Sequence, residues 1–127
     1  AHFRGARAFD PEVSFILDHI GKPAIREGRL DPWRADIERL AALPNVWCKL
    51  SGMVTEGDWA NWAPADFTPY LDVIFDWFGP ERVMAGSDWP VCLLAGAYSD
   101  VIAIVREYVE SRFPSHYEAI FGGTAAA

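Results

Sequence analysis

Residues 15–23 read Phe-Ile-Leu-Asp-His-Ile-Gly-Lys-Pro, an apolar run that ends abruptly in ionisable residues and a glycine. Two later stretches follow the same plan: Cys-Lys-Leu-Ser-Gly at 48–52 and Gly-Ser-Asp-Trp-Pro-Val at 86–91. Short apolar segments in which apolar and polar residues do not strictly alternate are typical of strands that are covered on both faces. We therefore predict three buried strands, over 13–19, 46–51 and 82–88.

Amphipathic patterns separate these strands. Apolar residues recur at helical spacing within three segments, 32–43, 68–78 and 100–112. Asp31-Pro32 and Thr68-Pro69 predict the first two helix starts, because an N-cap residue followed by proline favours initiation. A short fourth helix is predicted over 115–121, and the residues before Asp10 look like the end of another. The alternation predicts βαβ units with a parallel sheet and right-handed crossovers.

The spacing of the strands limits the fold. Val13, Val46 and Arg82, which begin the three predicted strands, lie 33 and 36 residues apart, the size of one βα unit. A doubly wound sheet and a (βα)8 barrel both fit this pattern. A complete barrel needs ~250 residues, whereas this chain has 127. It would supply less than half of one.

Composition narrows the function classes. The chain has 11 Lys and Arg against 18 Asp and Glu, a net charge of −7, which argues against a nucleic-acid partner. No apolar run reaches the ~18 residues of a membrane span. Cys48 and Cys92 are the only cysteines and lack metal or redox spacing, so a reducing, cytoplasmic compartment is expected. We expect a small-molecule partner.

Ionisable residues follow the first and third predicted strands, and carboxyl ends of parallel strands share one edge. His19 would be a metal ligand or an electrophile that polarises a carbonyl, or a strand-end histidine held by a backbone carbonyl. Asp88 would bind a metal or act as general base on water, or serve as a turn residue. One His and one Asp cannot complete a zinc site. The missing ligands would lie outside this chain, or no metal binds.

Further candidates lie near these two. Lys49 and Ser51 share one face of the second strand. Lys49 either presents a charge to an anionic substrate or extends to solvent, and Ser51 would donate a hydrogen bond to substrate. Trp89 lines a pocket or fills a gap, and Lys22 is a loop cation that faces substrate or solvent. Cys48 points the opposite way and is assigned to the core. The sequence lacks a phosphate-binding glycine loop and a serine nucleophile elbow.

Together the three motifs resemble the amidohydrolase-related family of TIM-barrel hydrolases, most closely its L-fuconolactonase and sulfomuconolactonase branch. The likeness extends to Phe-Gly-Pro-Glu-Arg at 78–82 and Ile-Phe-Gly-Gly-Thr-Ala-Ala at 120–126. It implies that residues 1–127 are the C-terminal part of one (βα)8 barrel and supply its sixth to eighth strands.

The resemblance also implies roles. His19 would be the sixth-strand histidine that contacts the metal or the lactone carbonyl, and Asp88 the eighth-strand aspartate that activates water. A divalent ion, zinc above all, is expected, although some members of the wider family work without one. The implied activity is hydrolysis of a sugar-acid or related lactone or carboxylate substrate. The remaining candidates would lie near that substrate: Lys22, Lys49, Ser51 and Trp89.

Other interpretations stay open. A non-catalytic α/β fragment or interaction module would keep the motifs without a working site. A small flavodoxin-like domain would need a phosphate-cradling loop that is not found. Three strands alone leave two sheet edges to pair, so a homo-oligomer is also left open.

Overall fold

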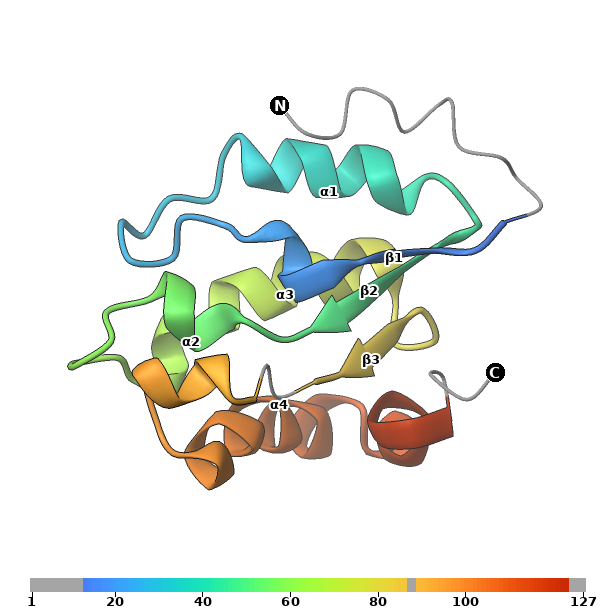
Figure 1. Cartoon of the computed structure of the whole chain (residues 1–127). Helices are drawn as coiled ribbons and strands as arrows, with labels where there is room; N and C mark the ends of the chain where they lie inside the picture. Colours follow the sequence, from blue (N-terminus) through green and yellow to red (C-terminus); the bar gives the residue numbers. More distant parts are fainter. Residues whose placement is uncertain (1–12, 87–88, 124–127) are drawn as a thin grey trace.

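The computed structural model of the chain describes residues 13–86 and 89–123 (Figure 1). Its sheet has three strands in the order β1–β2–β3: Phe15–Leu17, Val46–Leu50 and Val83–Ala85. Both pairings are parallel, with Phe15 opposite Val46 and Cys48 opposite Val83. The predicted parallel α/β arrangement is therefore confirmed.

Helices connect and follow the strands. The α-helices within the described residues are α1 (Trp33–Ala41), α2 (Met53–Glu56), α3 (Thr68–Phe78) and α4 (Tyr98–Arg112). Shorter 3-10 segments are η2 (Asp18–Gly21), η3 (Pro64–Asp66), η4 (Val91–Leu94) and η5 (Pro114–His116). A π-helical turn, η6 (Ala119–Gly123), packs beside β3.

The short helix predicted over 115–121 is confirmed as a helical stretch of mixed type, in which η5 continues through Tyr117 and Glu118 into η6. A prediction about a helix cap needs correction. Asp31 does not cap α1: its carboxylate accepts a hydrogen bond from Arg34 Nη2 at 2.7 Å, and the helix begins at Trp33 without a side-chain cap. The helix predicted before Asp10 lies outside the described residues.

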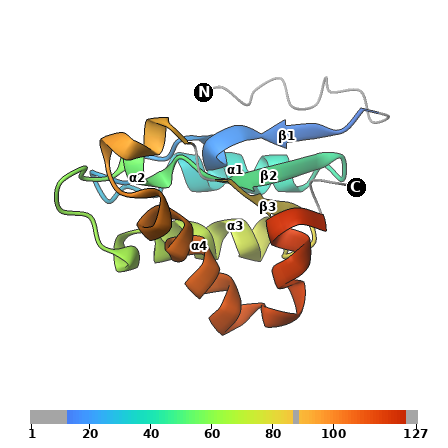
Figure 2. The ribbon, with the colours of Figure 1, turned by 60° about the horizontal axis from the view of Figure 1, so that its bottom comes forward.

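One face of the sheet is packed against helices. Alternate residues of β2 point to this face and are buried, as is their neighbour on β3: Val46, Cys48, Leu50 and Val83. Both α1 and α3 contact β2 and each other, and α3 and α4 lie together on one side of the strands in Figure 2. Each large apolar side chain buried here contributes roughly 1.5–3 kcal/mol.

The opposite face is more open. Ile16 is 58% exposed although it pairs with Trp47, and both Trp47 and Lys49 are only partly buried. In a closed parallel barrel such a face turns toward the interior and is filled by side chains of the other strands.

Arg82 secures the amino-terminal end of the sheet. Its guanidinium donates to four backbone carbonyls: from Nη2 to Ala41 at 2.7 Å, from Nη1 to Leu43 at 2.8 Å and Val46 at 3.2 Å, and from Nε to Phe78 at 3.3 Å. Burial lowers the pKa of this group. Because α1 ends at Ala41 and α3 at Phe78, one cation satisfies carbonyls that both helix ends leave free.

Candidate functional site

Four polar side chains meet at the carboxyl ends of β1 and β2. Asp18 and His19 follow β1 in η2, Lys49 lies in β2, and Ser51 follows it. A 2.8 Å hydrogen bond joins His19 Nδ1 and Ser51 Oγ, and Asp18 Oδ2 lies 3.3 Å from His19 Nε2. The other Asp18 oxygen is 3.5 Å from Lys49 Nζ. The four side chains form one continuous chain of contacts, which we call the strand-end cluster.

Exposure rises along this cluster. Ser51 is only 2% exposed, the His19 side chain is 20% exposed, and the Asp18 side chain is 61% exposed. The inner member is therefore closed off by protein, whereas the carboxylate is open to solvent or to a ligand. Such a gradient suits a binding site, because the buried end orients groups and the open end meets the ligand.

The loop that presents His19 has an unusual backbone. His19, Ile20 and Lys22 all have positive φ, at 50°, 46° and 50°, a region that non-glycine residues rarely adopt and that costs of order 1–3 kcal/mol each. Ile20 is fully buried, and its carbonyl accepts a 2.6 Å hydrogen bond from Trp33 Nε1. Packing and this bond hold the strained conformation, which is a feature that concentrates at functional sites.

Two glycines make room for the cluster. A Cβ on Gly52 would lie 2.8 Å from His19 Cβ, and one on Gly86 would lie 2.6 Å from Lys49 Cε and 3.2 Å from Ser51 Cβ. At Gly52 a side chain would displace the His19 Cβ, which the backbone fixes, whereas at Gly86 it would mainly move the flexible end of Lys49. Both glycines stand in the motifs that the sequence analysis quoted, so this signal was visible in the sequence.

The predicted site residues do not all enter the cluster. Asp88 lies outside the described residues, and its role stays a prediction. The Lys22 side chain is exposed, and the backbone N–H of Lys22 donates a 2.9 Å hydrogen bond to the His19 carbonyl. Trp89 is 64% exposed. Asp18 was not selected from the sequence, although it stands directly beside His19 in the first motif.

Cys48 is confirmed as a core residue. Its side chain is fully buried on the helix-packed face, opposite to Lys49. Burial, and secondarily the charge of Asp18, raise the pKa of its thiol far above the ordinary value. The thiol therefore stays neutral and supplies neither a nucleophile nor a thiolate ligand.

The donor atoms of the cluster fit part of a metal site. His19 Nε2 and Asp18 Oδ2 lie side by side, while Ser51 engages the other ring nitrogen. Within residues 13–86 and 89–123, no group of three or more His, Cys, Asp and Glu side chains is placed to hold an ion. A complete zinc site takes three or four protein ligands, so further ligands would come from outside this described part.

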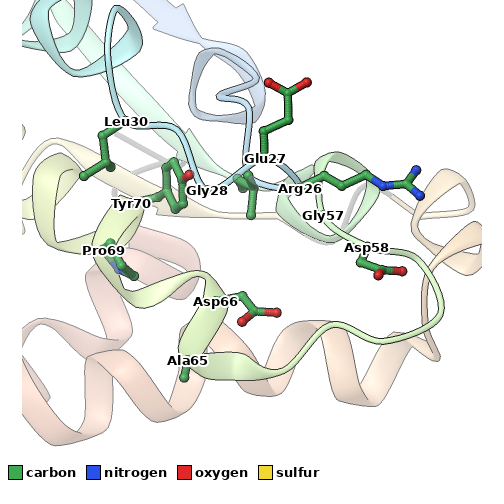
Figure 3. Close-up of a pocket in the computed structure, with 11 residues that line it drawn as sticks. Arg26, Glu27, Gly28, Leu30, Gly57, Asp58, Ala65, Asp66, Pro69 and Tyr70 are labelled. Atoms are coloured by element: carbon green, nitrogen blue, oxygen red, sulfur yellow. The ribbon is translucent and has the colours of Figure 1, made fainter.

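A separate pocket of about 490 Å³ lies between the loop after η2 and the segment that leads into α3 (Figure 3). Its polar groups already serve the loops around it: Tyr70 Oη donates to the Arg29 carbonyl at 3.0 Å, and Asp66 accepts from Ala63 N–H at 3.0 Å. No member of the strand-end cluster lines it. We therefore place the site at the strand ends and not in this pocket.

The chain has a parallel βαβ sheet with polar side chains at the carboxyl ends of its strands. These features place it among the α/β proteins whose active sites lie at that edge of the sheet. The sequence model of the amidohydrolase family matches residues 6–127, and the chain belongs to this family. Among the described helices, none has the length and apolar character needed to cross a bilayer.

Similar proteins agree with this assignment. The chain is 49% identical over 121 residues to L-fucono-1,5-lactonase of Burkholderia multivorans, a match that covers 87% of this chain and 41% of the relative. The L-fucono-1,5-lactonase of Burkholderia ambifaria is 41% identical over 120 residues, with 91% and 41% covered. The chain thus spans about two fifths of the length of these curated relatives.

A solved structure matches the fold directly. The crystal structure of an amidohydrolase from Burkholderia multivorans with bound zinc superposes with a TM-score of 0.85 at 49% sequence identity. The match covers 90% of this chain and 43% of that chain. The predicted fold class, part of a (βα)8 barrel of the amidohydrolase family, is confirmed.

Proposed function

We propose that this chain forms part of the active site of a lactone hydrolase that opens a sugar-acid or related lactone with water. The observation that carries the proposal is the strand-end cluster, in which the His19 ring is held from its buried side and its Nε2 is directed toward the exposed Asp18 carboxylate. The relatives named as lactonases share this region of sequence.

The proposed reaction needs no covalent nucleophile. Water attacks the lactone carbonyl carbon, and Asp88 accepts the proton that the water loses. His19 Nε2 faces the carbonyl oxygen and stabilises the negative charge that develops there. The bond to the ring oxygen then breaks, and that oxygen takes up the proton as a free hydroxyl. The product is an open hydroxy acid, whose carboxyl group then releases its proton to solvent and becomes a carboxylate.

Lys49 is the proposed substrate-facing cation. Its ammonium lies 3.5 Å from Asp18 and is partly exposed on the open sheet face. A cation in this position attracts an anionic substrate and the carboxylate that hydrolysis creates. Lys22 and Trp89, both exposed on loops that follow the strands, are proposed as contacts at the rim of the site.

As the alternative to direct contact between His19 and the carbonyl oxygen, His19 and Asp88 would hold a divalent metal, with Asp18 alongside, by analogy with the zinc of the Burkholderia multivorans structure. When bound, it supplies Lewis-acid polarisation of the carbonyl. The chemistry of the donors supports this, because Ser51 engages His19 Nδ1 and the other ring nitrogen, Nε2, lies beside the Asp18 carboxylate.

The proposed partner is a small lactone or carboxylate rather than a nucleic acid, since the net charge is −7. A cytoplasmic location is proposed because the two cysteines, Cys48 and Cys92, are buried and form no disulfide. Because three strands leave two sheet edges to pair, a homo-oligomer is proposed as well.

The test measures hydrolysis of a panel of sugar lactones by the full-length protein that contains these residues. Asp88→Asn and His19→Asn should each lower kcat/KM by about 10²- to 10⁴-fold, because each removes a group that handles a proton or the developing charge. Matched controls are Asp76→Asn on the exposed side of α3 and His116→Asn in η5, which should leave the rate unchanged. The proposed function fails if no lactone is opened, or if the site variants hydrolyse as fast as the controls.

A further inference from the structure

Ser51 is a buried polar residue that the proposed reaction does not use. It is 2% exposed, and its Oγ lies 2.8 Å from His19 Nδ1. Because protein closes off the hydroxyl, it is poorly placed to touch a substrate. Its described side-chain partner is the imidazole, on the opposite ring nitrogen from the one that faces Asp18.

A hydroxyl suits this place better than other polar groups. When Nε2 carries the proton and faces the Asp18 carboxylate, the Ser51 hydroxyl donates to Nδ1. In the other tautomer, Nε2 carries no proton and can accept a hydrogen bond, while Nδ1 carries the proton and donates it to Ser51 Oγ. Ser51 therefore holds the ring in either tautomer without moving it.

Gly52 also restricts the position of the His19 imidazole. A Cβ at this position would lie 2.8 Å from both Cβ and Cγ of His19 and 2.9 Å from Nδ1. The imidazole thus occupies the space that a side chain at residue 52 would fill. The positive φ of Gly52, 69°, is also one that glycine adopts without strain.

We propose that Ser51 and Gly52 are positioning residues: the hydroxyl and the bare Cα together fix the plane of the His19 ring and aim Nε2 at the ligand. The assignment of a lactone as that ligand rests on the proposed function, whereas the constraint on the ring does not. Ser51 thereby acts through His19 and not, as the sequence suggested, as a direct donor to substrate.

The first test replaces Ser51 in the full-length protein. Ser51→Ala should lower kcat by about 10- to 100-fold, the usual effect of losing a partner that orients a reactive histidine, with little change in KM. Nitrogen-15 NMR of the imidazoles, with His19→Asn to assign the signals, should show the two ring nitrogens of His19 losing their wild-type shifts. A merely structural role for Ser51 would leave those shifts unchanged.

Ser51→Cys is the matched variant, because it keeps the volume of the side chain while its thiol is a weak hydrogen-bonding group. We expect it to resemble Ser51→Ala in both kcat and ring shifts. Wild-type kcat and shifts in the folded Cys variant would overturn the proposal for Ser51. Thermal unfolding of each variant checks that the protein is folded.

The second test compares two glycines of similar φ. Gly52 and Gly28 have φ of 69° and 66°, but a Cβ on Gly28 would meet nothing within 4 Å. Alanine should introduce a similar positive-φ strain at both sites, whereas only Gly52→Ala also clashes with His19 and should displace the ring and lower kcat by at least about tenfold. Equal kcat in the two variants would overturn the role of Gly52.

The two proposals fail separately. If the wild-type protein opens no lactone yet Ser51→Ala alters the His19 shifts, the function is rejected and the positioning role stands. If the shifts stay as in the wild type, the positioning role is rejected whatever the activity.

Discussion

The two ends of the strands use polar groups in opposite ways. At the amino-terminal end, the Arg82 guanidinium bonds only backbone carbonyls among its described hydrogen-bond partners. At the carboxyl end, the strand-end cluster joins side chains to one another, from the buried Ser51 to the exposed Asp18. Its supporting loop departs from ordinary backbone geometry at His19 and Ile20.

Under the proposed function, the amino-terminal end of the strands serves the fold and the carboxyl end serves the chemistry. Removing a cation that satisfies buried carbonyls leaves those carbonyls without a partner, which is costly. Removing a partly exposed side chain at the carboxyl end costs the fold little, because solvent can replace its contacts. Stability and activity should therefore be separable by substitution at the two ends, as expected for parallel barrels.

The largest expected effect on stability is that of Arg82→Ala. It should lower the free energy of unfolding by about 3 kcal/mol, since several carbonyls lose a charged donor at once. Arg34→Ala, which breaks an exposed pair with Asp31, is the control and should cost less than about 1 kcal/mol. Denaturant unfolding measures the two variants. Equal losses in the free energy of unfolding would contradict the assignment of the amino-terminal end of the strands to stability.

An intermediate effect is expected at alkaline pH. Burial raises the pKa of the Cys48 thiol, so the folded protein keeps this proton while the unfolded chain releases it near the ordinary value of 9.0. The unfolded state then binds fewer protons, and the free energy of unfolding falls as pH rises above 9.0, by up to about 1.4 kcal/mol per unit. Cys48→Ser should flatten this fall; parallel curves from pH 8 to about pH 11 would contradict the burial of a neutral thiol.

The smallest effect on stability is expected for the outer pair of the cluster. Lys49→Met breaks the contact with Asp18, which is partly exposed, and should change the free energy of unfolding by less than about 1 kcal/mol. The same variant should raise KM for an anionic substrate in the full-length protein. A stability loss as large as that of Arg82→Ala would show that the carboxyl end also holds the fold together.

The sequence allowed the elements to be located where local signals agree. The helix over 68–78 was predicted to the residue, because Thr68-Pro69 begins it and Gly79-Pro80 ends it. Each predicted strand contains an observed one, and the motifs that follow β1 and β2 contribute the cluster. These predictions succeed because they depend on the periodicity of apolar residues and on the proline and glycine residues that begin and end helices, and both signals act over a few residues.

The details of the site depend on contacts between distant residues. The positive φ of Ile20 is maintained by a bond from Trp33 and by burial, and no local pattern encodes that. The sequence analysis gave Ser51 a substrate-facing role and could not foresee its contact with His19, because that contact depends on the register of β1 with β2. Asp18 was passed over for the same reason, since Lys49 reaches it across that pairing.

Arg82 has a further consequence, for the order of folding. Its bonds to Ala41, Leu43 and Val46 join residues 36 to 41 positions apart, and its bond to Phe78 stays within the same turn region. The hydrogen bonds between residues far apart in sequence cannot form until α1 has docked beside the end of α3, because such contacts require the intervening chain to close into a loop first. Because these bonds need both helices in place, we expect the layer that α1 and α3 form to assemble in one cooperative step.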